Sequence, residues 1–289
     1  MFETIEIPEP QFAQLSAARL AWTSFGAQAQ ASGEPVLLLI RGLGTQSIEW
    51  PKALVDGFVS SGRRVVVFDN RDCGLSSDHA GETYTMSDMA RDCVELLDAL
   101  GVEQADVFGI SMGGMIVQRL LIEHPERLRR AVSVMSSTGA RDLPGPTAEA
   151  LAALQAPAPE TLEAAIEQNA EGRAVFGSPG DPLDAGTRSQ LARRALERAW
   201  RPDGVARQYA AILADGSRRE ALASVDTPVL VIHGADDALV PLAGGEDTAR
   251  SIPGAALHVV AGMGHDLPPA FVEEIVGVTV RFLDGVDSD

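Results

Sequence analysis

Continuous runs of apolar residues recur along the chain and predict buried strands. These runs cover residues 35–40, 64–68 and 105–109, and further strands are expected over 131–135, 228–233 and 256–260. An unbroken apolar run is typical of a strand that is covered on both faces, as in a parallel sheet. Two further segments, 3–7 and 19–25, predict a pair of opening strands that run antiparallel.

Between these runs, apolar residues recur at helical spacing. The clearest case is 87–100, which places its apolar residues on one face of a helix. We expect Ser87 to be the N-cap and Gly101 to follow the last residue, because serine accepts from unpaired N–H groups and glycine adopts the left-handed conformation there. A last helix is expected over 268–283.

The pattern changes between 138 and 226. This stretch has no strand-like run, is rich in alanine and is interrupted by prolines. It predicts about four helices, for example over 161–172 and 188–200. Because strand-like runs resume after it, we expect one α/β domain with an inserted helical cap. The first part of the core is 1–137, the cap is 138–226 and the second part of the core is 227–289.

Composition narrows the classes of function. The 289 residues carry a net charge of −18, which repels nucleic acid and anionic membrane surfaces. Two cysteines are too few for a disulfide framework, no apolar run is long enough to span a bilayer, and the first residues lack the apolar region of a signal peptide. We therefore expect a cytoplasmic protein, monomer or homodimer, that acts on a small molecule and binds neither nucleic acid nor membrane.

Familiar cofactor and metal motifs are absent from the sequence. No G-x-G-x-x-G opens a helix after a strand, no phosphate-binding loop is present, and His and Cys residues do not show metal-ligand spacing. We therefore expect neither a cofactor nor a metal.

A candidate nucleophile lies in Gly109-Ile-Ser-Met-Gly113. This run follows a predicted strand and precedes a predicted helix, which is the context of a nucleophile elbow, where a sharp turn exposes a serine above the sheet. Ser111 is therefore the candidate nucleophile. The alternative is a glycine-rich turn whose serine only caps the helix.

The serine hydroxyl needs a base within hydrogen-bond reach, and the base needs an acid that orients it. In this architecture the order along the chain is serine, acid, histidine. His265 follows the last predicted strand, in Gly262-Met-Gly-His265, and is the candidate base. The other histidines lie at a helix end, in or at the end of a strand, or before the serine: His79, His124, His233 and His258.

The candidate acid is one of two adjacent aspartates, Asp236 and Asp237. The spacing between Gly234 and Pro241 matches Asp237. Only one of two neighbouring side chains can face the imidazole while the other meets solvent. We therefore expect Asp237 to be the acid, with Asp236 as the alternative.

An oxyanion hole needs two backbone donors. The N–H of Met112, directly after the serine, is one expected donor, and the N–H of Leu43 is the other. Leu43 belongs to the loop Arg41-Gly-Leu-Gly44, which follows an apolar run. An ordinary strand-to-helix turn is the alternative for this loop.

Together these motifs resemble the α/β-hydrolase superfamily over nearly the whole chain. The stretches that carry the resemblance are Arg41 to Gly44, Asp69 to Ser76, Gly109 to Gly114, His124 to Arg127, His233 to Pro241 and Gly262 to His265. Trp50-Pro51, Asp69-Asn-Arg-Asp72 and Gly262-Met-Gly-His-Asp266 look closest to the branch that contains aclacinomycin methylesterase-like carboxylesterases. The resemblance implies a mostly parallel eight-stranded sheet, a helical cap over the pocket and ester hydrolysis through an acyl-enzyme.

Two positions depart from many members of this family. Arg41 stands where many have histidine, and Asp72 stands where many have glycine. We expect Arg41 to make a structural ion pair, and the alternative is that it binds a carboxylate of the substrate.

The sequence thus predicts a serine hydrolase that cleaves carboxylic esters with Ser111, His265 and Asp237. A lactonase, a carbon–carbon bond hydrolase or a cofactor-free perhydrolase would carry the same three residues, and the fold alone does not choose among them. The alternative from another class is a non-catalytic, ligand-binding member of the fold.

Overall fold

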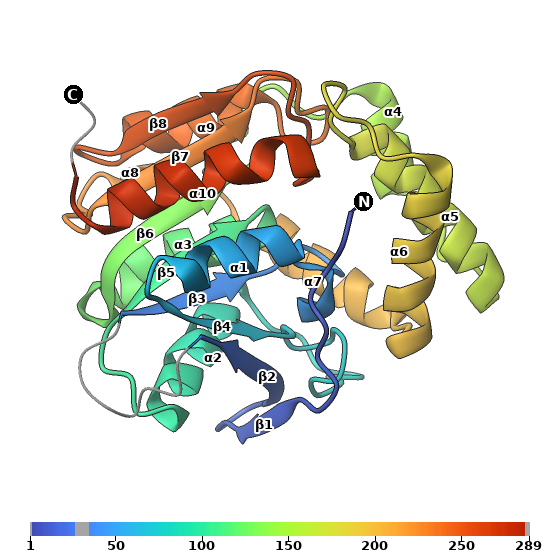
Figure 1. The fold of residues 1–289 in the computed structure, drawn as a ribbon, viewed down its shortest axis with the longest axis horizontal. Helices are drawn as coiled ribbons and strands as arrows, with labels where there is room; N and C mark the ends of the chain where they lie inside the picture. Colours follow the sequence, from blue (N-terminus) through green and yellow to red (C-terminus); the bar gives the residue numbers. More distant parts are fainter. Residues whose placement is uncertain (1, 27–34, 287–289) are drawn as a thin grey trace.

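The computed structural model describes residues 2–26 and 35–286, and in them the chain forms one eight-stranded sheet (Figure 1). The strands are β1 (Gln11–Gln14), β2 (Arg19–Phe25), β3 (Val36–Ile40), β4 (Arg64–Phe68), β5 (Ala105–Ile110), β6 (Leu128–Val134), β7 (Val229–Gly234) and β8 (Ala256–Val260). Their order across the sheet is β1-β2-β4-β3-β5-β6-β7-β8. Strand β2 runs antiparallel to both its neighbours, and every other neighbouring pair is parallel. The carboxyl ends of β3 to β8 therefore meet at one edge of the sheet, where ligands bind in open α/β sheets.

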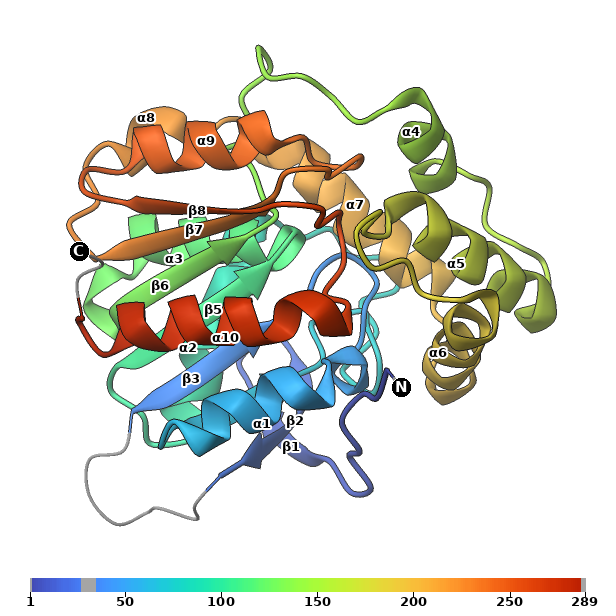
Figure 2. The same cartoon turned by 45° about the horizontal axis from the view of Figure 1, so that its top comes forward.

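Two layers of helices cover the sheet (Figure 2). Helices α1 (Lys52–Ser60) and α10 (Pro269–Leu283) pack on one face, in one apolar cluster with Leu37, Leu39 and Phe108. Helices α2 (Met86–Ala99) and α3 (Met112–Glu123) pack on the other face. Helix α9 (Leu242–Ser251) follows β7, and two short 3₁₀ turns, η1 (Ser47–Glu49) and η2 (Pro125–Arg127), complete this part. Strands β3, β4, β5 and β7 are buried on both faces, as apolar runs predict, whereas the edge strand β8 is largely exposed.

The remaining helices lie between β6 and β7, and we call them the helical insertion. They are α4 (Ala148–Leu154), α5 (Leu162–Phe176), α6 (Ala185–Arg198), α7 (Pro202–Asp215) and α8 (Arg219–Leu222). Helices α4, α5 and α6 project beyond the carboxyl edge of the sheet, and α7 returns toward it (Figures 1 and 2). Helix α8 packs against α3 and α9. No helix in the described residues is both long and apolar enough to cross a membrane.

Residues 3–7 do not form the predicted strand. Thr4 makes one isolated bridge to Pro51, and the first strand is β1. Pro8 and Pro10 offer no N–H to a neighbouring strand, so a hydrogen-bonded ladder is interrupted between the predicted segment and β1.

Two helix predictions also need correction. The N-cap of α2 is Thr85 rather than Ser87, because the Thr85 hydroxyl accepts from the Asp88 N–H and the Asp88 carboxylate accepts from the Thr85 N–H. Gly101 follows this helix with φ of 67°, as predicted. The stretch 138–226 holds five helices rather than about four, since the single turn of α8 is too short to show a helical period.

Candidate active site

Ser111 stands in a strained turn between β5 and α3. Its backbone has φ of 55° and ψ of −119°, in a region that non-glycine residues rarely adopt. The Ser111 N–H donates to the Val134 carbonyl at 2.9 Å, which holds the turn to β6. A Cβ atom at position 113 would lie 2.1 Å from the Ile40 carbonyl oxygen, and one at 109 would lie 2.2 Å from the Gly113 carbonyl oxygen. The turn therefore closes only with glycine at both positions, as in the predicted elbow.

A chain of hydrogen bonds joins three of the predicted site residues. The Ser111 Oγ and the His265 Nε2 are 2.9 Å apart, and the His265 Nδ1 and the Asp237 Oδ2 are 2.7 Å apart. Because an ionised carboxylate only accepts, Nδ1 carries the proton and Nε2 accepts from the serine. The other Asp237 oxygen accepts the N–H groups of Leu239 and Val240 at 2.9 and 2.8 Å. The carboxylate is thus fixed on one side by the backbone and turned to the imidazole on the other.

Asp236 points elsewhere. It is exposed, and its carboxylate accepts the N–H of Gly262 at 3.1 Å. Asp236 thereby links the loop after β7 to the loop after β8. Of the two adjacent aspartates, it is Asp237 that reaches His265.

His233 lies near the same carboxylate but is bound differently. Its Nε2 is 3.6 Å from the Asp237 Oδ2 and 2.7 Å from the Val240 carbonyl oxygen. Burial lowers the pKa of His233, against the smaller opposite effect of the Val240 carbonyl. A neutral His233 donates to the Val240 carbonyl and so holds the loop before Pro241. His79 takes no part in these contacts, and its Nδ1 lies 2.9 Å from the Glu82 Oε2.

The loop of residues 41–45, here called the β3 loop, packs against the serine. A Cβ atom at Gly42 would lie 3.1 Å from the Ser111 Cβ. In the described residues, the N–H groups of Leu43 and Met112 have no acceptor. The two expected donors are therefore unpaired, one on the residue after the serine and the other on the residue after Gly42, which packs against the serine.

A glutamine of the helical insertion holds the β3 loop in place. The Gln208 Oε1 accepts the Gly44 N–H at 2.9 Å, and its Nε2 donates to the Arg71 carbonyl at 2.8 Å. Gln208 is completely buried. On the same helix α7, Arg207 makes a bidentate pair with Asp72 at 2.7 and 2.8 Å. Asp72 therefore anchors the helix that carries Gln208. This contact gives a structural role to aspartate at a position where many members of the family have glycine.

The loop of residues 262–266, here called the β8 loop, is held by a different part of the insertion. The His265 N–H donates to the Phe176 carbonyl at 2.7 Å, and the Gly264 N–H donates to the Ser178 Oγ at 2.8 Å. The Asp266 carboxylate accepts both the N–H and the hydroxyl of Ser178. Burial raises the pKa of Asp266 to about 6, although the two Ser178 bonds act in the opposite direction.

Arg41 does not make the expected ion pair. In the described part of the chain, no carboxylate oxygen lies within 4 Å of its guanidinium. The group lies over the Trp50 ring, with 4.7 Å between Cζ and the ring centroid, and Nε donates to the Thr45 Oγ1 at 3.2 Å. Glu49 is the acidic residue with the largest electrostatic effect on Arg41, but its carboxylate is already bound to Arg173. The prediction of a structural ion pair is therefore wrong.

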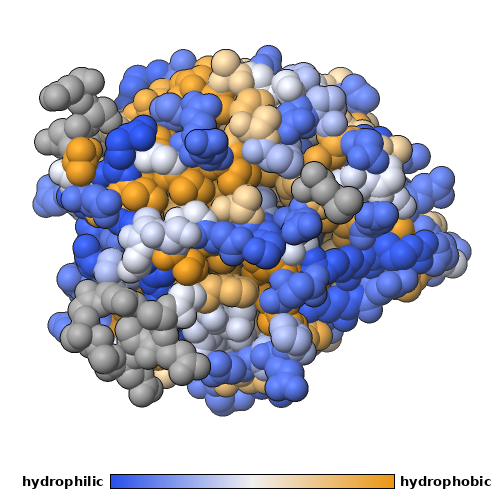
Figure 3. Space-filling model, viewed as in Figure 1, coloured by the Kyte–Doolittle hydropathy of each residue, from blue (hydrophilic) through white to orange (hydrophobic). Residues whose placement is uncertain are grey.

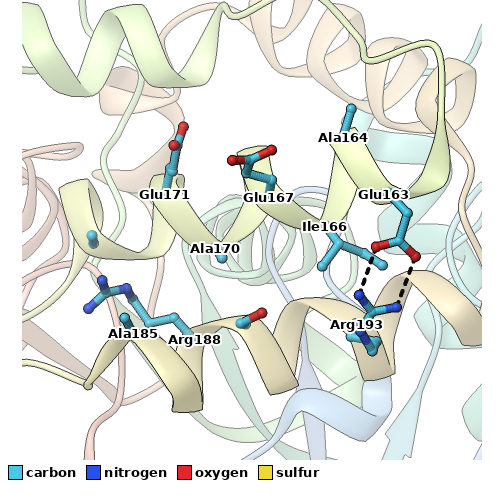
Figure 4. Close-up of a pocket in the computed structure, with 11 residues that line it drawn as sticks. Glu163, Ala164, Ile166, Glu167, Ala170, Glu171, Ala185, Arg188 and Arg193 are labelled. Carbon is cyan, nitrogen blue, oxygen red and sulfur yellow. Dashed lines mark hydrogen bonds and ion pairs between the residues drawn. The ribbon is translucent and has the colours of Figure 1, made fainter.

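Two grooves lie in or beside the helical insertion. One of about 530 Å³ lies between α5 and α6, where Glu163 pairs with Arg193 (Figure 4). This part of the surface is mostly hydrophilic (Figure 3). A second groove of about 300 Å³ includes Gly177, Ser178 and Asp236, and so borders the β8 loop. In residues 2–26 and 35–286, no three His, Cys, Asp or Glu side chains gather as metal ligands would.

Sequence reasoning missed Gln208 and Ser178. Both act on loops that are 164 and 86 residues away along the chain. The local signal for Gln208 is a glutamine on the buried face of an alanine-rich amphipathic helix. The sequence around Ser178, which follows Gly177, gives no such signal.

Comparison with known proteins agrees with this architecture. Residues 35–268 match the family model of the alpha/beta hydrolase fold. The chain is 32% identical over 270 residues to rhodomycin D methylesterase DnrP of Streptomyces peucetius, with 84% of this chain and 90% of that protein covered. It is 30% identical over 268 residues to 2-hydroxymuconate semialdehyde hydrolase of Pseudomonas putida, with 90% of each covered.

A solved structure, described as a hydrolase from Pseudomonas aeruginosa PA01, has a TM-score of 0.77 and 30% identity to this chain. The match covers 96% of this chain and 99% of that one. The family match and the methylesterase relative confirm the resemblance seen in the sequence motifs. The chain belongs to the α/β-hydrolase fold family.

Proposed function

We propose that the protein is a serine hydrolase that cleaves carboxylic esters through an acyl-enzyme. The observation that carries the proposal is the hydrogen-bond chain from Ser111 through His265 to Asp237, on a strained turn at the carboxyl edge of the sheet. A serine, an imidazole and a buried carboxylate in this order form the usual apparatus of acyl transfer. The methylesterase relative supports an ester as the substrate.

In the first step the Ser111 Oγ attacks the ester carbonyl carbon. The His265 Nε2 takes the hydroxyl proton and then gives it to the oxygen of the leaving alcohol. The Asp237 carboxylate stabilises the imidazolium that exists between these transfers, and the 2.7 Å bond to Nδ1 keeps the ring in the reactive tautomer.

The tetrahedral intermediate carries negative charge on the former carbonyl oxygen. The N–H groups of Leu43 and Met112 are the donors that we assign to it, because both are unpaired and directly follow Gly42 and Ser111, which contact each other. One such donor contributes about 3–4 kcal/mol to stabilisation of the transition state. A water molecule, deprotonated by His265, then attacks the acyl-enzyme and releases the acid.

The proposal can be tested without a known substrate. The protein is incubated with a fluorophosphonate probe, and the labelled peptide is identified by mass spectrometry. We expect Ser111 to be labelled in the wild type, with no label in Ser111→Ala and strongly slowed labelling in His265→Ala. If folded wild-type protein leaves Ser111 unlabelled, a non-catalytic, ligand-binding role replaces this proposal.

Carbon–carbon bond hydrolysis is the second candidate, because the Pseudomonas putida relative is named for 2-hydroxymuconate semialdehyde hydrolysis. A lactonase and a perhydrolase use the same three residues. Assays of 4-nitrophenyl esters, a lactone series and a ring-cleavage product separate these chemistries. We expect kcat/KM to be highest for an ester, and a higher value for a ring-cleavage product would favour the second candidate.

A further inference from the structure

Arg41 opens the β3 loop, directly before the residue that packs against the nucleophile. It is 93% buried, since only 7% of its surface is exposed. Its neighbour Gly42 lies against Ser111. Arg173, on helix α5, is close enough to lower the pKa of Arg41. The guanidinium therefore lies where the β3 loop meets the helix whose last residue, Phe176, holds His265.

Most of the hydrogen-bonding capacity of this guanidinium is unused. Nε donates to the Thr45 Oγ1, but in the described residues neither terminal nitrogen has an acceptor. Neither of these two nitrogens is fully enclosed by protein, so both touch space that water can enter. Four N–H donors of one planar group are therefore available to a ligand.

The nearby acidic residue does not satisfy this charge. Of the two Glu49 oxygens, one accepts from Arg173 and the other accepts the Gln46 N–H. Burial lowers the pKa of Arg41 to about 10, so the group still carries its charge at neutral pH. A charge that is largely shielded from water and makes only one hydrogen bond favours an anion that completes the pair.

We propose that Arg41 is a subsite for an anionic group and that the preferred substrates are esters that carry a free carboxylate. A planar guanidinium with two free terminal nitrogens matches a carboxylate with two parallel hydrogen bonds. The net charge of −18 repels anions from the molecule as a whole, so any preference for an anionic ester must arise locally. The kinetic part of this inference rests on the ester hydrolysis proposed above.

The kinetic test uses matched 4-nitrophenyl esters whose acyl chains end in a methyl group or in a carboxylate. The pairs are butanoate with succinate monoester, pentanoate with glutarate monoester and hexanoate with adipate monoester, each corrected for spontaneous hydrolysis. We expect kcat/KM of the wild type to favour the charged ester by about tenfold or more in at least one pair, chiefly through a lower KM.

Three variants locate the effect. Arg41→Met, which keeps an unbranched side chain but removes the guanidinium, should lose the preference, and Arg41→Lys should keep part of it. Arg193→Met is the matched control, because it removes one positive charge from an exposed position on α6. It should leave the preference unchanged. A wild type that prefers the neutral ester in every pair overturns the proposal, as does an Arg41→Met variant that keeps the preference.

A binding measurement separates this inference from the proposed reaction. Ser111→Ala is titrated by calorimetry with monomethyl adipate and with methyl hexanoate. We expect the anionic ester to bind about tenfold more tightly, and the difference to vanish in Ser111→Ala/Arg41→Met. Equal affinities overturn the subsite even if nitrophenyl esters are hydrolysed. If no ester is hydrolysed but the Arg41-dependent difference remains, the subsite stands and the proposed reaction fails.

Discussion

The β3 loop and the β8 loop meet at the same serine, but the helical insertion holds them by different chemistry. The β3 loop is fixed by Gln208, an uncharged amide that bonds to backbone atoms on both sides. The β8 loop is fixed by Ser178 together with Asp266, a carboxyl group whose pKa is raised to about 6 by burial. The Gln208 bonds themselves thus contain no ionisable group, whereas the other attachment contains a carboxyl group that titrates near neutrality.

This difference separates two requirements of the proposed reaction. Oxyanion donors contribute only if they are fixed in advance, which suits a rigid and uncharged attachment. The histidine must accept and return a proton, and it is held by a loop with its own ionisable neighbour. Each of the following experiments tests one side of this comparison.

The largest effect is expected where the β8 loop meets the acid. Asp237→Asn should lower kcat about 10⁴-fold, because the amide favours the wrong imidazole tautomer. Asp236→Asn is the matched control and should remain close to the wild type, since the Asp236 carboxylate accepts the Gly262 N–H and lies outside the hydrogen-bond chain. Steady-state kinetics on a 4-nitrophenyl ester measures both. Equal losses in the two variants would contradict the assignment of the acid.

On the β3 side, Gln208→Leu should lower kcat by about 10- to 100-fold with little change in KM, because a misplaced oxyanion donor loses transition-state stabilisation. Gln118→Leu is the control. Gln118 is also completely buried and donates to the Ser137 carbonyl at 3.1 Å, but it does not touch the β3 loop. If both variants lose kcat equally, the effect reflects the loss of any buried glutamine.

Asp266 is expected to make stability depend on pH. Its folded-state pKa of about 6 lies above the ordinary value, so the folded state resists ionisation of this carboxyl group. Its favourable contribution is complete below about pH 4 and is lost as the pH rises through about 6. Asp266→Asn keeps an acceptor for Ser178 and should raise the free energy of unfolding by about 3 kcal/mol at pH 8. Urea titrations at pH 4 and pH 8 measure this, and an equal shift at both pH values would refute it.

The smallest effect is expected for the energetic coupling between the Gln208 attachment of the β3 loop and the Ser178 attachment of the β8 loop. Gln208 and Ser178 share no hydrogen-bond partner. Gln208→Leu and Ser178→Ala should each raise the activation free energy. The two increases should therefore add in the double variant within about 0.5 kcal/mol. A larger coupling would show that the two loops are held as one unit.

The sequence predicts those parts of the molecule whose signals are local. Ser111 stands out because a strand, a glycine-flanked serine and a helix must follow one another directly. His265 and Asp237 follow strand ends, and the structure brings both within hydrogen-bond distance of their partners. Short apolar runs likewise predict the central strands.

Contacts between distant segments leave no comparable pattern. Arg41 is expected to pair with a carboxylate because isolated buried charges are rare, and nothing near it in sequence shows that Glu49 is already bound. The role of Gln208 depends on where α7 docks, which Arg207 and Asp72 decide from positions 135 residues apart. These interactions emerge only when the insertion and the sheet are placed together.

The attachment of α7 also has a consequence for recombination between related proteins. Gln208 bonds to the backbone N–H of Gly44 and the backbone carbonyl of Arg71, not to their side chains. A chimera that receives the helical insertion of this protein can therefore keep the Gln208 bonds whatever side chains stand at positions 44 and 71, provided that an aspartate at position 72 still pairs with Arg207 and that the two loops follow the same path. Insertions and sheets of different origin become exchangeable parts if a designer retains Gln208 together with the pair of Arg207 and Asp72.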